Sequence, residues 1–372
     1  MIKRNLFIPL IFEIKNVILF SFFLFSISSY AQKDSIKNPN RTKVIGLPVF
    51  FYTPDTKIGG GGAALLTFNF KQDSTRARRS SVTIGAVYTQ LNQTLLYFPF
   101  QLFPQNQKYW ISGELGYFKY VFNFFGVGNN IPTGYIEKYD ATFPRVRLNV
   151  SKKISRNLFF GFRYAFDNFK FTRVKAEGLL AEGKITGSKG GRVSGVGIQF
   201  NYDSRDLLFF PRKGWVAETF LYAEGRATGS QFQYQRFSAD VTRYFPTGKE
   251  GVIAINGVAI LSLGDVPFHQ MPVIGGTKRL RGYFEGKYRD ENMLIMQSEW
   301  RFPIFKRFGG VAFGGVGEVT DKPLAWNFSN IRYNFGGGLR FTLDKAQHLN
   351  IRADYGIGYR SQGFYLTFGE AF

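Results

Sequence analysis

The sequence alternates between apolar and polar residues over many segments, and this pattern constrains the fold more than any other feature. From residue 158 to residue 166, Leu, Phe, Phe, Tyr and Phe take every second position, while Gly, Arg, Ala and Asp take residues 161, 163, 165 and 167. Successive side chains of a β-strand point to opposite faces, so one face here is apolar and the other polar. The pattern recurs at residues 195–202, 294–302, 333–341 and 349–357. Strands that separate lipid from a polar interior have this character.

The number of such segments indicates the fold class. We predict an all-β chain that forms a transmembrane antiparallel β-barrel of about sixteen strands over residues 44–372, with about fourteen as the alternative, because an even number keeps both ends on one side. The strands of a soluble β-sandwich also alternate between apolar and polar residues. Such a fold would not place Arg, Asp and Glu on the inward face of so many strands. Residues 103–107, 151–155 and 246–249 are predicted short periplasmic turns, and residues 123–139, 174–190 and 264–290 are predicted long outer loops.

The first 31 residues have the layout of an export signal. Lys3, Arg4 and Lys15 precede an apolar core over residues 17–27, and small residues flank Tyr30 at the expected cleavage site. We predict a signal peptide over residues 1–31, a short segment over residues 32–43, and then the barrel. The alternative is an uncleaved anchor, although the core is short for a membrane span. Export and a barrel together predict the outer membrane of a Gram-negative bacterium.

Composition excludes several kinds of chemistry. The chain has no Cys and only two His, which excludes disulfides and thiolate sites and leaves little for a His-based metal site. His269 lies in a loop and His348 beside a turn, so neither suggests an enzyme. The net charge of +22 is spread along the strands, with a short block only at Arg76, Arg78 and Arg79, so we expect no nucleic-acid binding. No cofactor is expected.

Two motifs near the C-terminal end carry a family resemblance. The predicted loop over residues 264–290 contains Leu280-Arg281-Gly282-Tyr283, and a strand with Glu299, Arg301 and Pro303 follows it. Together these resemble the sixth outer loop and the next strand of the BamA/TamA-type surface-antigen superfamily. The resemblance implies that the loop folds back into the barrel and that its Arg packs against acids on the inner wall. The alternation points Glu299 and Arg301 into the lumen, so Glu299 is the expected partner of Arg281.

Further segments resemble the same family. They are a hairpin with Asp203, Arg205, Asp206, Pro211 and Gly214, the segment 52–56 followed by four glycines, the segment 125–129, and a C-terminal end with Phe364, Leu366, Phe368 and Phe372. The last resembles the C-terminal signal, carried by Phe368 and Phe372, that the barrel-insertion machinery reads.

The chain also departs from the family pattern at two points. Gly315 stands where the family often has an Asp, so Arg281 is expected to depend on Glu299 or on Asp354. The family usually carries periplasmic POTRA domains before the barrel, and the short segment 32–43 leaves no room for one.

The resemblance implies a component in the assembly or transport of outer-membrane protein or lipid that acts without POTRA domains. A passive, anion-preferring pore is the first alternative, because Arg163, Arg301, Arg340 and Arg352 are expected to point inward. A structural subunit of an outer-membrane complex is the second. The expected partners are outer-membrane lipids and lipopolysaccharide, and possible protein partners lie in the outer membrane or the periplasm. No enzyme is expected.

Overall fold

The computed structural model describes residues 42–71, 73, 78–132, 134–207, 210–323, 325–344 and 349–372. Residues 42–372 form one compact unit. The predicted signal peptide over residues 1–31 and almost all of the segment 32–43 lie outside the described residues, as do Arg76 and His348.

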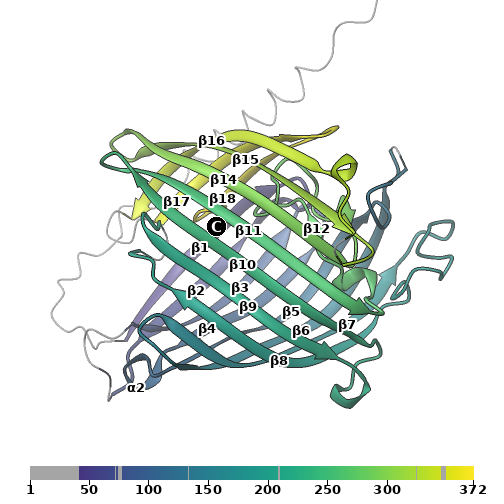
Figure 1. The fold of residues 1–372 in the computed structure, drawn as a ribbon, viewed down its shortest axis with the longest axis horizontal. Helices are drawn as coiled ribbons and strands as arrows, with labels where there is room; N and C mark the ends of the chain where they lie inside the picture. Colours follow the sequence, from purple (N-terminus) through teal and green to yellow (C-terminus); the bar gives the residue numbers. More distant parts are fainter. Residues whose placement is uncertain are drawn as a thin grey trace, which may run out of the picture. The chain divides into compact units, whose positions relative to one another are not determined.

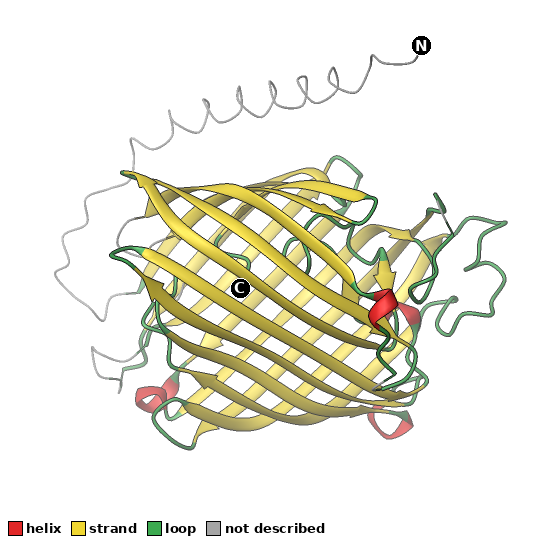
Figure 2. Ribbon diagram, turned by 45° about the horizontal axis from the view of Figure 1, so that its top comes forward, coloured by secondary structure: helices red, strands yellow, loops and turns green. Residues whose placement is uncertain are grey.

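The described strands form one closed antiparallel barrel of sixteen strands, which confirms the predicted fold class (Figures 1 and 2). Each strand pairs with its neighbours in sequence, except that β11 pairs with β14 and β1 meets β18. The strands are β1 (Lys43–Thr53), β2 (Lys57–Phe68), β3 (Ser80–Thr89), β4 (Thr94–Leu102), β5 (Tyr109–Phe124), β6 (Glu137–Lys153), β7 (Leu158–Arg173), β8 (Gly191–Asp203), β9 (Gly214–Glu224), β10 (Tyr234–Thr247), β11 (Gly251–Gly264), β14 (Asn292–Phe305), β15 (Phe308–Thr320), β16 (Arg332–Asp344), β17 (Leu349–Gly358) and β18 (Ser361–Phe368).

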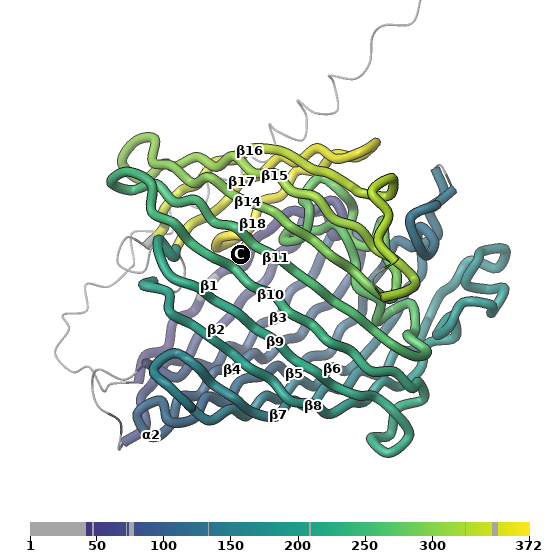
Figure 3. Tube along the Cα trace, in the orientation of Figure 1, coloured from purple at the N-terminus to yellow at the C-terminus, as the bar shows by residue number. Residues whose placement is uncertain are grey.

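The barrel has two unlike ends, and the longer connections gather at one of them (Figure 3). We call this the loop end, and it carries residues 125–136, 174–190 and 265–291. The opposite end, here the turn end, holds the start of β1, the end of β18 and short connections such as residues 154–157, 248–250 and 306–307. The predicted turns and loops therefore cover connections between strands, although residues 151–153 of the predicted turn 151–155 belong to β6. The strands extend further than predicted, because the pairing of β5 with β6 continues to Phe124 and Glu137.

Among residues 42–372, helical structure in the described ranges is confined to short connections. A single turn, α2 (Pro104–Gln107), joins β4 to β5, and the 3-10 turns η2 (Arg226–Thr228), η3 (Phe268–Gln270) and η4 (Phe328–Asn330) lie in loops. In the part of the chain that the structure describes, no helix has the length and apolar character needed to cross a membrane.

The alternation in sequence corresponds to the two faces of the wall. Phe162 and Met296 point outward and are 68% and 61% exposed. Glu299 and Arg301 point inward, and each is 1% exposed. The outward face is apolar and fits lipid, as predicted.

The interior is not polar along its whole height. Toward the loop end the inward positions become aromatic, and Phe118, Tyr139 and Phe169 pack against the loop residues Leu180 and Phe268. A second apolar cluster joins Leu280 and Tyr283 of the loop to inward residues of β11, β14 and β15. The loop end of the lumen is therefore packed like a protein core, a feature that the alternation alone does not reveal.

Candidate functional site: a loop anchored inside the barrel

The connection from β11 to β14, residues 265–291, turns back into the barrel. Its two short strands, β12 (Val273–Ile274) and β13 (Tyr288–Arg289), pair with each other and leave residues 275–287 as the tip of the loop. Leu280, Arg281 and Tyr283 are almost completely buried, although they lie in a loop.

Gly282 lets this tip approach the wall. Its φ of +113° is one that L-residues rarely adopt, and a Cβ there would lie 2.8 Å from the carbonyl carbon of Gly356 in β17. Gly356 has no side chain either, so loop and strand backbones lie in direct contact. Glycine is therefore required at residue 282 both by conformation and by space.

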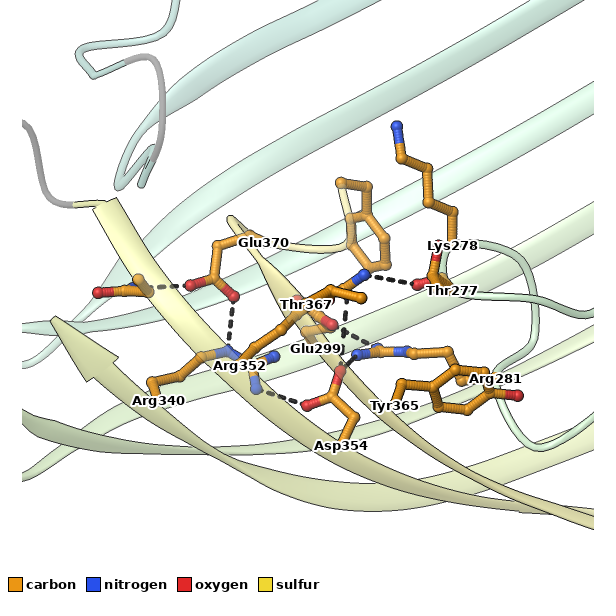
Figure 4. A network of polar contacts seen from close by, with 12 residues as sticks. Thr277, Lys278, Arg281, Glu299, Arg340, Arg352, Asp354, Tyr365, Thr367 and Glu370 are labelled. Carbon is orange, nitrogen blue, oxygen red and sulfur yellow. Dashed lines mark hydrogen bonds and ion pairs between the residues drawn. The ribbon is translucent and has the colours of Figure 1, made fainter. Parts of the chain in front are cut away.

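Arg281 contacts two buried carboxylates (Figure 4). Its Nη2 forms an ion pair with Oε1 of Glu299 in β14, and its Nη1 lies 2.5 Å from Oδ2 of Asp354 in β17. The guanidinium also lies over the ring of Phe313, with its Cζ 3.6 Å from the ring centroid. The two Nη groups of the planar guanidinium thus reach acids on two different strands. A lysine ammonium could not do this with the same geometry.

Three more arginines extend the contacts into a network. Arg301 pairs with Glu299 at 2.7 Å, Arg340 pairs with Asp354 at 2.5 Å, and Arg352 lies 3.5 Å from Asp354. All the side chains involved are at most 3% exposed. Charges this deeply buried require partners, because an unpaired one would lose its hydration without compensation.

Glu370 completes this network and was missed by the sequence reasoning. Its Oε2 accepts a hydrogen bond from Arg340 Nε at 2.8 Å, its Oε1 accepts one from Asn350 Nδ2 at 2.8 Å, and it lies 3.7 Å from Arg301 Nε. It follows β18 along the chain, so strand alternation gave no signal for it. Its acidic character beside so many inward arginines was the one available clue.

Gly315 stands where the family pattern led us to look for an Asp, and packing explains it. A Cβ at this position would lie 2.6 Å from Cβ of Gln297 and 2.8 Å from Cδ2 of Leu280. Leu280 of the loop therefore fills the space that a side chain would need. Arg281 has Asp354 as its second acid instead.

The loop tip also contacts both sides of the junction between the first and last strands. Gly282 N donates to the hydroxyl of Tyr365 in β18 at 2.9 Å, and this hydroxyl donates to the carbonyl of Tyr283 at 3.0 Å. On the other side, Glu285 N donates to Oδ1 of Asp55 in the β1–β2 turn at 3.1 Å. Burial raises the pKa of Asp55 to about 7, and the nearby charge of Glu285 acts in the same direction.

The junction itself has little strand pairing. Within the described strands, β1 and β18 share one pair of facing residues, Tyr52 and Leu366. By contrast, β1 pairs with β2 along its full length, from Lys43 to Thr53. Residues 43–49 of β1 therefore present an edge with no described strand partner on this side.

The predicted hairpin motif lies at the turn end and is separate from the Arg281 site. Arg205 donates to both carboxylate oxygens of Asp203 at 2.9 Å, and Asp206 Oδ1 accepts from the backbone of Arg212 at 2.9 Å. Pro211 is buried, and Gly214 has a φ of +107° and lies against the backbone of Ser204. These residues shape the connection between β8 and β9.

The two predicted signal residues at the C-terminal end lie in different environments. Phe368 is the last residue of β18 and is 41% exposed on the outward face. Phe372 does not continue this face, because the chain leaves the sheet at Gly369, whose φ is +74°. The ring of Phe372 packs against Tyr244, Val252 and Ala254, and its backbone oxygen accepts from Arg301 at 2.7 Å. Phe372 therefore lies on the inner side of the wall, whereas Phe368 lies on the outer side.

No arrangement for catalysis or metal binding appears in the described residues. His269 stacks on Phe169, with ring centroids 4.3 Å apart, and burial lowers its pKa to about 3, so it stays neutral. Within the described ranges, no group of three or more His, Cys, Asp or Glu could hold a metal ion.

These features define a class: transmembrane β-barrels whose lumen is occupied by an anchored loop. A family model described as the Omp85 superfamily domain matches residues 19–372, so the chain belongs to that superfamily. Barrels of this superfamily serve in assembly and transport and are not enzymes.

Three solved structures are similar in fold to this chain. BamA from Haemophilus ducreyi, lacking POTRA domains 1–3, has a TM-score of 0.61 at 14% identity, over 89% of this chain and 70% of that one. CdiB from Acinetobacter baumannii has a TM-score of 0.55 at 14% identity, over 87% and 59%. CdiB from Escherichia coli has a TM-score of 0.57 at 10% identity, over 88% and 62%. The chain thus spans about 60 to 70% of the length of these structures. No curated protein matches the sequence.

Proposed function

We propose that this chain is a barrel of the outer membrane of a Gram-negative bacterium, that its loop end faces outward, and that it takes part in the assembly or transport of outer-membrane protein. The observation that carries the proposal is the free edge of β1. Residues 43–49 pair with β2 on one side and have no described strand partner on the other.

A free edge of this kind is a template for strand addition. Each residue along it offers a backbone donor or acceptor, and an incoming extended segment can satisfy both. In a membrane the alternative is costly, because water is not available to satisfy these groups. Pro48 lies within the edge, which is one of the places where a strand tolerates a residue without an N–H.

The packing inside the barrel favours the β1 edge, over the central axis of the lumen, as the path of an outer-membrane protein during its assembly or transport. Apolar clusters fill the loop end of the lumen, so an axial path meets packed side chains. A passive anion-preferring pore also gains little support, because Arg301, Arg340 and Arg352 are engaged by Glu299 and Asp354.

The absence of Cys from the sequence allows a direct test. A cysteine replacing Gly46 in β1 is compared with one replacing Gly257 in the fully paired β11, since a side chain at either position meets nothing within 4 Å. We expect G46C to crosslink to newly exported outer-membrane proteins during their assembly and G257C to show little crosslinking.

A second measurement tests whether cells need the protein for this role. Depletion of the protein should lower the amounts of assembled outer-membrane proteins. If G46C and G257C crosslink equally and depletion leaves both outer-membrane protein and lipopolysaccharide levels unchanged, the proposed function is wrong.

A further inference from the structure

One arginine stands on the lipid-facing side of three strands that are otherwise uncharged on that side. Arg243 lies in β10 between Thr242 and Tyr244, whose inward side chains are 2% and 1% exposed. Its own side chain therefore points outward, like that of Phe245. Along β9, β10 and β11, which are neighbours in the wall (Figure 1), every other outward residue of the described strands is uncharged. A basic side chain that faces lipid is destabilising unless it reaches polar partners.

Two aromatic rings hold the guanidinium of Arg243. Its Cζ lies 4.8 Å from the ring centroid of Trp215 in β9 and 5.1 Å from that of Phe245. Both rings lie on the outward face, where they are 42% and 41% exposed. Among the described residues, no carboxylate forms an ion pair with Arg243 and no acceptor takes a hydrogen bond from it. Its N–H groups are therefore available to a ligand outside the protein.

The position of Arg243 along the wall matches the boundary between lipid and water. It lies four residues before Thr247, where β10 ends at the turn end of the barrel. Tyr202 and Trp215 are the second residues from the same end of β8 and β9, and both are exposed on the outward face. Tyr and Trp gather at this boundary, where a ring can contact both acyl chains and headgroups. Arg243 thus lies at the height of lipid headgroups.

The connections beside this site add further positive charge. Lys213 precedes β9, whose first residue pairs with the residue that follows Arg243. Arg212 donates from Nη2 to the backbone oxygen of Lys249 in the turn after β10. Residues 204–213 and 248–250 together hold four cations, one of which pairs with Asp203, against two acids. An anion at Arg243 therefore meets no excess of negative charge on this side.

We propose that Arg243, Trp215 and Phe245 bind the headgroup of an anionic phospholipid in the leaflet at the turn end. The planar guanidinium donates to the phosphate oxygens, and the two rings contact the lipid beside its headgroup. A lipid suits the site better than an acidic protein, because Arg243 points sideways into the membrane and not past the turns. The inference rests on the proposed placement of the barrel in the outer membrane, but not on any role of the β1 edge.

The test uses the full chain purified in detergent micelles, with phosphatidylglycerol as the probe and native mass spectrometry as the readout. R243Q should bind this lipid about tenfold more weakly, the loss expected for one charge-assisted contact. R243K keeps the charge but loses the planar donors and should bind about threefold more weakly. The matched control, K170Q, removes an exposed outward cation near the opposite end of β7 and should bind like the unmodified protein. Equal binding by R243Q and K170Q overturns the site.

Three further probes separate an anionic lipid from other ligands. Phosphatidylcholine has a phosphate but no net charge and should bind more weakly, so equal binding overturns the preference for an anionic headgroup. Glycerol 1-phosphate lacks acyl chains and polyglutamate represents an acidic protein segment, and neither should displace phosphatidylglycerol at equal concentration. Displacement by either one overturns the lipid as the occupant. Retained heat-modifiability on gels shows that each variant is folded, and the crosslinking by G46C is independent of all these outcomes.

Discussion

Replacement of Arg281 by Ala should destabilise the folded barrel strongly. The substitution removes two ion pairs, to Glu299 and Asp354, whose side chains are at most 2% exposed. Both acids keep another arginine, so no buried charge is left uncompensated, and the expected cost is about 3 kcal/mol, from the loss of two charge-assisted contacts of about 1.5 kcal/mol or more each. R281K should lose about 2 kcal/mol, because lysine keeps the charge but can reach only one of the two acids well.

The assay is urea unfolding in lipid vesicles, followed by tryptophan fluorescence. The control is R173A, which removes an arginine that pairs with Asp140 at 3.0 Å but whose side chain is 67% exposed. Such an exposed pair contributes less than about 1 kcal/mol. Trypsin should also cleave R281A faster at Lys278 and Arg279, since the loop is less firmly anchored. If R281A and R173A unfold at the same urea concentration, the reasoning that the lumen network anchors the loop is wrong.

Three further changes test other contacts. G282A should prevent the loop tip from docking, because a Cβ at residue 282 would lie 2.8 Å from the backbone of Gly356, and trypsin sensitivity of the loop measures this. Asp55 has a folded-state pKa of about 7, above its unfolded value, so stability should fall as pH rises from about 4 to about 7. D55N keeps a side-chain oxygen that accepts from Glu285 N, and its free energy of unfolding should differ less between pH 5 and pH 8 than that of the unmodified protein. An unchanged difference contradicts this assignment. E370Q should lower the unfolding temperature because it weakens the contacts to two buried arginines, whereas an unchanged temperature would show that the contacts contribute nothing.

Much of the fold could be predicted because lipid imposes a simple rule on every strand. Outward residues such as Phe162 and Met296 are apolar since they meet lipid, and inward ones such as Glu299 are polar. The rule fails near the loop end, where packed loops take the place of water. Inward residues there, including Tyr139 and Phe169, are aromatic because they form a core with the loops.

The candidate site was predicted in part. The pairing of Arg281 with Glu299 is present in the structure, since both residues belong to local motifs with readable alternation. Glu370 and the inward turn of Phe372 were missed, because residues after Gly369 no longer follow the strand. The contact between Asp55 and the loop joins residues 230 positions apart in sequence, and no local pattern encodes such a distance.

The charged network has a consequence for the time course of folding. All of its members lie between Arg281 and Glu370, in three late strands, the loop and the last residues, so the first eleven strands can pair before any of these charges meet. Contacts made after the rate-limiting step slow unfolding and leave the folding rate almost unchanged. We therefore expect the network to determine how long the barrel persists once formed, while the β-hairpins of the early strands determine how fast it forms.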